Sequence, residues 1–157
     1  MAGPGFLAVW SGAMVAMMLP SELPLLRLDH ATSRSPLRTS VLGAGYAAVW
    51  LAVGFAAMEL PFDVPLWWAL GLALVYQVTP VKRRCLAVCR APLARIFHGW
   101  RDGYVGAFRM GVENGLWCLG CCIGFTVVLV ALGMTSIVWM AVVGGVIFLE
   151  KAGPWAI

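Results

Sequence analysis

The sulfur-bearing side chains are the residues of this sequence whose type and spacing could bind a metal ion. They form three short groups, which are Met14, Met17 and Met18; Cys85 and Cys89; and Cys118, Cys121 and Cys122. Residues three or four positions apart share one face of a helix, so each group can present two sulfur atoms in the same direction. Thiolates and thioethers select soft metal ions. The pattern therefore predicts a site for Cu(I), with zinc as the second candidate.

Packing is the alternative explanation for each group taken alone. Methionine often fills gaps between helices, and cysteine is among the most frequently buried residue types. His30 and His98 are expected to be solvated rather than to act as ligands. The sequence has no phosphate-binding glycine loop, no Ser-His-Asp set and no His-Glu-x-x-His motif. We therefore expect no catalytic activity from the chain alone.

The composition places the 157-residue chain in a membrane. Hydrophobic residues make up 62% of the sequence and charged residues 11%, and the mean hydropathy is +0.89. Soluble domains contain about 25% charged residues, so these few charges cannot cover a water-facing surface. The apolar runs are continuous and of helical length, which argues against alternating barrel strands. The sequence predicts an all-α polytopic membrane bundle, formed as a single transmembrane domain over residues 1–157.

Five apolar runs are the predicted transmembrane helices. They cover residues 4–19, 39–60, 64–79, 116–133 and 134–149. An additional interfacial amphipathic helix is predicted from Pro92, because proline suits the first turn of a helix. Its apolar residues at helical spacing are Leu93, Ile96, Phe97, Trp100 and Tyr104. Glu113 and Asn114 are expected to cap the fourth run, since acids and asparagine are favoured at helix N-termini.

The positive charges set the predicted orientation. Seven of the eleven Lys and Arg residues lie in the basic loop 82–109, three lie between the first two runs, and Lys151 follows the last run. Because cytoplasmic loops hold the positive charge, we expect the N-terminus outside and the C-terminus inside the bacterial inner membrane, with Glu150 and Lys151 as an interfacial stop. The three sulfur groups then lie near the cytoplasmic leaflet. The basic loop is expected to contact anionic lipids and not nucleic acid.

Several motifs, taken together, resemble those of a known bacterial family. They are Ala16-Met17-Met18-x-Pro20, Tyr76-Gln-x-Thr79-Pro80-x-Lys82-x-x-Cys85-Leu-x-x-Cys89-Arg90, and Cys118-Leu-Gly-Cys121-Cys122. With these motifs the chain resembles the predicted metal-binding integral membrane proteins, a family whose domain has no assigned function. The resemblance implies that the ligands are Cys85, Cys89, Cys118, Cys121, Cys122, Met17 and Met18. It implies a metal without implying an activity.

Three functions are consistent with these observations. The first is the binding of Cu(I) for copper handling, or for its delivery to a membrane metalloenzyme. The second is an accessory subunit of a larger membrane complex, in which the cysteines only pack and the chain contacts other membrane subunits or a second copy of itself. The third is a membrane thiol oxidoreductase that uses Cys118 with Cys121 or Cys122 as a redox pair.

Overall fold

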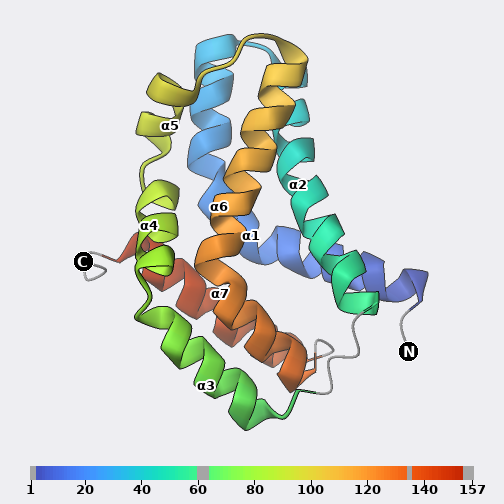
Figure 1. The fold of residues 1–157 in the computed structure, drawn as a ribbon. Helices are drawn as coiled ribbons and strands as arrows, with labels where there is room; N and C mark the ends of the chain where they lie inside the picture. The colour runs from blue at the N-terminus through green and yellow to red at the C-terminus, as the bar shows by residue number, and fades with distance from the viewer. Residues whose placement is uncertain (1–2, 60–63, 134–135, 154–157) are drawn as a thin grey trace.

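The chain is helical throughout the part that the structure describes. The computed structural model describes residues 3–59, 64–133 and 136–153, and these form seven helices and no strand (Figure 1). The helices are α1 (Pro4–Ser33), α2 (Pro36–Glu59), α3 (Leu66–Gln77), α4 (Pro80–Cys89), α5 (Pro92–Gly99), α6 (Gly103–Leu132) and α7 (Ile137–Ala152). The prediction of an all-α fold is confirmed.

Helix α1 is bent where it contains two prolines. Pro20 and Pro24 lie inside this 30-residue helix. Each proline removes a backbone donor and clashes with the preceding turn, which kinks a helix. In Figure 1 the first half of α1 lies across the lower part of the molecule, and the second half turns upward beside α2. The run predicted over residues 4–19 is therefore only the first arm of a helix that continues to Ser33.

Fewer helices can cross a membrane than the sequence predicted. Within the described residues, three helices are long and apolar enough, namely α1, α2 and α6. Helix α3 has 12 residues and α7 has 16. At a rise of about 1.5 Å per residue they are shorter than the roughly 30 Å hydrocarbon core of a bilayer. Five complete spans are thus not observed, and the predicted limits at residues 60 and 134 lie outside the described residues.

The basic segment 82–109 is folded rather than an open loop. It contains most of α4, all of α5 and the beginning of α6. The predicted amphipathic helix is shorter than expected, because α5 ends at Gly99 and Tyr104 already belongs to α6. Gly103, between the two helices, has a φ of 77°, a left-handed conformation that glycine adopts without strain. The glycines in this segment therefore divide the predicted helix into two.

The N-terminus of α6 corrects a second prediction. The helix begins at Gly103, so Glu113 and Asn114 lie inside it and do not cap it. Asn114 is buried and its side-chain amide donates a hydrogen bond to the carboxylate of Glu22 in α1. Glu113 instead accepts from Arg101 at 2.8 Å. The polar pair Asn114 and Glu22 therefore joins two apolar helices.

Helix α6 is central to the packing, since α2, α3, α4 and α7 all contact it. Its closest approach is to α2, where Gly111 faces the backbone of that helix. A Cβ atom at Gly111 would lie 3.0 Å from the carbonyl carbon of Leu42 and 3.0 Å from the amide nitrogen of Tyr46. Small residues at such crossings let two helix backbones touch. The glycine is therefore required by the distance between α2 and α6.

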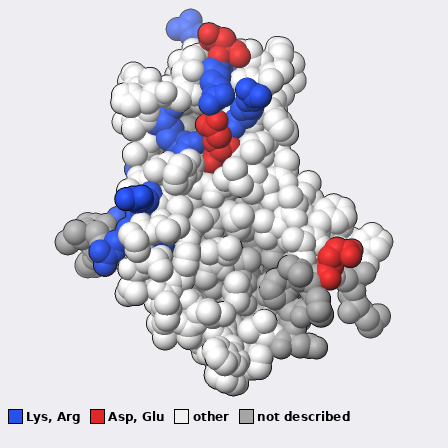
Figure 2. Space-filling model, viewed as in Figure 1, with Lys and Arg blue, Asp and Glu red and all other residues white. Residues whose placement is uncertain are grey.

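The charged side chains gather at one end of the molecule. Figure 2 shows them over the upper part and along one edge, while the lower part is almost entirely uncharged. At the charged end, a buried ion pair joins Arg38 of α2 to Asp29 of α1. Arg38 also donates to the Arg101 carbonyl at 2.8 Å and lies 3.9 Å above the ring of Trp100. One arginine thus ties α1 and α2 to the segment that leads into α6.

The close approach of α2 and α6 predicts a stability difference between two glycine substitutions. Gly111→Ala should lower the free energy of unfolding by about 1–3 kcal/mol, because the new methyl group overpacks against backbone that cannot move aside. Gly12→Ala is the control, since nothing lies within 4 Å of a Cβ at that helical position. Denaturant unfolding in detergent should show Gly12→Ala to be neutral or stabilising. Equal effects of the two substitutions would contradict the packing described here.

Candidate metal centre

Three thiols of α6 lie together in the interior. The Sγ atoms of Cys118, Cys121 and Cys122 are all within 4.8 Å of one another, and all three residues are buried. The Sγ atoms of Cys121 and Cys122 are 3.4 Å apart. The spacing of three and four residues places these side chains on neighbouring positions of one helical face. This part of the arrangement follows directly from the sequence.

Two other helices each add a sulfur atom to this group. The Sγ of Cys89, the last residue of α4, lies 3.7 Å from the Sγ of Cys121. The Sδ of Met18 in α1 lies 3.9 Å from the Sγ of Cys118. We call the set of Met18, Cys89, Cys118, Cys121 and Cys122 the sulfur cluster. It unites residues that are up to about a hundred positions apart in the chain.

The backbone near each ligand explains why these helices meet. Thr79 caps α4 by accepting from the amide of Lys82, and Pro80 occupies the first turn. On α6, Gly120 faces Cys85, and a Cβ at that glycine would lie only 2.6 Å from the Cys85 Sγ. The missing side chain therefore lets α4 approach α6. Cys85 lies in the same core as the cluster, against the residue that precedes Cys121.

The remaining predicted ligands are not members of the sulfur cluster. Met14 is buried in the same core, one turn before Met18. Met17 is directed toward α7, where its Cγ would be 3.2 Å from a Cβ at Gly144. His30 and His98 are both exposed, as expected for solvated histidines. The structure thus brings together four of the five cysteines and one of the three methionines.

A lysine at the end of the chain reaches the cluster. Lys151 Nζ donates to the Cys118 Sγ at 3.1 Å and lies 4.0 Å from the Met18 Sδ. The prediction of an interfacial stop at Lys151 did not include this contact. Its neighbour Glu150 pairs with the buried Lys82 at 2.9 Å, which fixes the end of α7 against α4. The ammonium supplies positive charge beside sulfur atoms that become negative when they bind a metal.

Two more polar groups near the cluster were missed by the sequence analysis. The hydroxyl of Tyr46 lies 3.1 Å from the Cys118 Sγ. Glu22, which bonds to Asn114, is buried in the part of α1 between its two prolines. The sequence could have indicated Glu22, because an ionisable residue inside an apolar helix is a functional candidate by default. Its partner was not predictable, since the contact spans 92 residues of sequence.

The chemistry of the donor set fits a soft ion. Four thiols and one thioether converge, and all five cysteines of the chain are free rather than joined in disulfides. Thiolate and thioether sulfur favour Cu(I), and carboxylate or imidazole sites favour other metals. Exclusion of water by the buried surroundings strengthens the interaction between thiolate and cation. The arrangement can therefore bind a monovalent soft cation.

The two cysteines of α4, a helix outside the three long apolar helices, have raised pKa values. Burial raises the pKa of the Cys85 thiol above its ordinary value. The contact with Cys121, together with burial, raises the pKa of the Cys89 thiol. Both side chains therefore carry a proton at neutral pH when no metal is bound. Metal binding to either sulfur must displace that proton.

Comparison with known proteins adds an independent observation. The model of a family described as PpoB2, copper chaperone, matches residues 7–157, which is all but the first six residues of the chain. No curated protein and no solved structure matches it. The matched range includes every residue of the sulfur cluster and Lys151.

The raised pKa values predict that copper binding depends on pH. Below its raised pKa, a thiol holds its proton and competes with the metal, so the affinity for Cu(I) should fall as the pH falls. For each proton displaced, the dissociation constant should rise by about tenfold per unit decrease of pH. Competition with a Cu(I) chelator of known affinity between pH 6 and pH 8 measures this slope. A pH-independent affinity would indicate a thioether site, because methionine has no proton to lose.

Proposed function

The chain belongs to the PpoB2 family of copper chaperones, and we propose that it holds one Cu(I) ion in the sulfur cluster for delivery to a membrane metalloenzyme. The observation that carries this proposal is the convergence of Met18, Cys89 and the thiols of α6 from three helices. A copper chaperone needs soft ligands that bind tightly and can be exchanged one at a time. Several adjacent sulfurs meet both requirements.

The charges around the cluster support the holding of a cation. When two or more thiolates bind Cu(I), the complex is anionic, and an uncompensated buried anion is costly. Lys151, which contacts Cys118 and Met18, supplies a compensating positive charge from α7. Because Lys151 is not a ligand, it lowers the cost of the complex without competing for the metal. The lysine therefore stabilises the loaded cluster without occupying a ligand position.

We also propose that the chain is an integral protein of the bacterial inner membrane. The three long apolar helices support this placement, and the uncharged lower part in Figure 2 is where they would meet lipid. In Figure 1, α2 and α6 both begin at the top of the molecule, which is the charged end. Both helices run from there toward the lower part. The shorter α3 and α7 fill the lower part without full spans of their own.

The positive charges then define the proposed orientation. The charged end, which carries α4, α5 and the beginning of α6, faces the cytoplasm and its anionic lipids. The sulfur cluster lies between that end and the uncharged part, near the cytoplasmic leaflet. The partner that receives the copper is a membrane enzyme that contacts the same leaflet. An accessory subunit without a metal would leave the sulfur cluster and the lysine beside it without a role.

Copper content of purified variants tests the proposal. The chain purified in detergent should bind one Cu(I), and Cys118→Ser combined with Cys121→Ser should abolish binding, because it removes two central thiols. Met18→Leu should weaken binding by about tenfold through the loss of one soft ligand. Met17→Leu is the matched control, since that neighbouring methionine faces Gly144. Unchanged copper in the double cysteine variant would rule out the site and leave a packing role for the cysteines.

Cysteine labelling tests the orientation. Glu59 is the last residue of α2, and Thr32 lies near the end of α1, just before α2 begins. Both residues are exposed, and they mark opposite ends of α2. In spheroplasts, Glu59→Cys should react with a membrane-impermeant maleimide, and Thr32→Cys should react only after permeabilisation, because the basic segments face the cytoplasm. The unsubstituted chain gives the background from its native thiols. The opposite labelling pattern would place the sulfur cluster at the outer leaflet.

A further inference from the structure

A pocket lies between α4, α5 and α6. Its volume is about 480 Å³, and its walls include Val88, Ala91 and Trp117. Val88 precedes Cys89 and Trp117 precedes Cys118 in the chain, so two walls of the pocket are next to sulfur ligands. Cavities of this size hold small molecules rather than folded partners.

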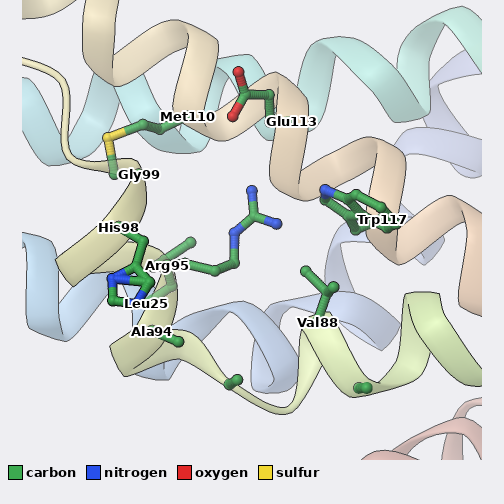
Figure 3. A pocket seen from close by; sticks show the side chains of 11 residues that line it. Leu25, Val88, Ala94, Arg95, His98, Gly99, Met110, Glu113 and Trp117 are labelled. Carbon is green, nitrogen blue, oxygen red and sulfur yellow. The ribbon is translucent and has the colours of Figure 1, made fainter.

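An arginine whose guanidinium makes no hydrogen bond extends into this pocket. Figure 3 shows the guanidinium of Arg95 in the space between Val88, Glu113 and Trp117. Among the described residues the Arg95 guanidinium makes no hydrogen bond and no salt bridge, although the carboxylates of Glu113 and Glu22 act on its charge, and Glu113 is paired with Arg101 at 2.8 Å. Burial lowers the pKa of Arg95, which shows that its charge is partly removed from water. A half-buried guanidinium that makes no side-chain hydrogen bond can receive an anion, and its planar fork matches a carboxylate.

The most accessible thiol does not line the pocket, but its neighbour Val88 does. Cys85, Cys118, Cys121 and Cys122 are buried, and only Cys89 among the cysteines is partly exposed. A thiolate at Cys89 would raise the pKa of Arg95, so the two side chains lie near each other. Cys89 in turn contacts Cys121 at 3.7 Å, so an ion received at Cys89 is within one step of the buried thiols. An anion-binding group, a cavity and an exchangeable thiol therefore lie together.

We propose that this pocket binds a small thiol that carries a carboxylate, and that this thiol exchanges Cu(I) with Cys89. Arg95 holds the carboxylate, and the apolar walls enclose the rest of the molecule. The inference rests on the proposed function, since it names the carrier that loads or unloads the same site. It assigns Arg95 a role in recognition and not in metal ligation.

The exchange balances without a redox step. During loading, the bond between Cu(I) and the carrier sulfur breaks as the bond between Cu(I) and the Cys89 Sγ forms. The proton of the Cys89 thiol passes to the released carrier thiolate, which leaves as a neutral thiol. Copper remains Cu(I) throughout, and unloading is the reverse reaction.

Transfer rates from two donors test the proposal. Cu(I)–glutathione provides a thiol with carboxylates, and Cu(I)–cysteamine provides a thiol without one. With the full chain in detergent, Arg95→Gln should slow transfer from glutathione by about tenfold, because one charge-assisted contact is lost. Transfer from cysteamine and the final copper content should not change. Arg83→Gln is the matched control, since Arg83 is exposed on α4 and does not line the pocket.

Two results would overturn the proposal, namely equal slowing of both donors or no slowing of either. A separate measurement keeps it independent of copper. S-methylglutathione has the carboxylates but no free thiol, and equilibrium dialysis should show that it binds the unsubstituted chain and not the Arg95→Gln variant. If the chain takes copper from no donor, the proposed function fails, yet dialysis still decides whether the pocket recognises the carboxylate. Equal binding to both forms of the chain would remove that role from Arg95.

Discussion

The fold depends on the absence of side chains at a few positions of α6. Gly111 meets the backbone of α2, and Gly120 meets the sulfur of Cys85 in α4. In lipid, apolar side chains gain little by leaving their surroundings for one another, so close backbone contact is a main source of helix association. Because α6 is approached on several sides, the thiols that it carries contact residues of four other helices. The sulfur cluster is a consequence of this close packing as much as of the cysteine spacing.

Much of the helical content, and part of the candidate site, could be predicted because both arise from local pattern. Continuous apolar runs predict helices, and the spacing of Cys118, Cys121 and Cys122 predicts one face. The length of α1 could not be predicted in the same way, since hydropathy falls after Leu19 although the backbone remains helical through two prolines. The role of Lys151 could not be predicted either. Its contact with Met18 spans 133 residues of sequence, and local sequence patterns do not predict contacts over such a separation.

Polar contacts determine how the helices of this apolar protein are aligned. Apolar surfaces slide with little change in free energy, whereas a buried polar group tolerates only the partner that satisfies it. Glu22 with Asn114 aligns α1 with α6, and Arg38 with Asp29 aligns α1 with α2. Lys82 with Glu150 aligns α4 with α7. These contacts fix the alignment of the helices that carry the sulfur cluster.

The distribution of the cluster along the chain also constrains its biosynthesis. Met18 is made early, Cys89 midway, the thiols of α6 late, and Lys151 only with the final helix. A growing chain therefore presents the sulfur groups one after another, and no group alone contains all the members of the cluster. The cluster is complete only after α6 has packed beside α1 and α4, and the charge of Lys151 arrives last. A chain that stops before α7 can hold the sulfurs but lacks the positive charge beside them.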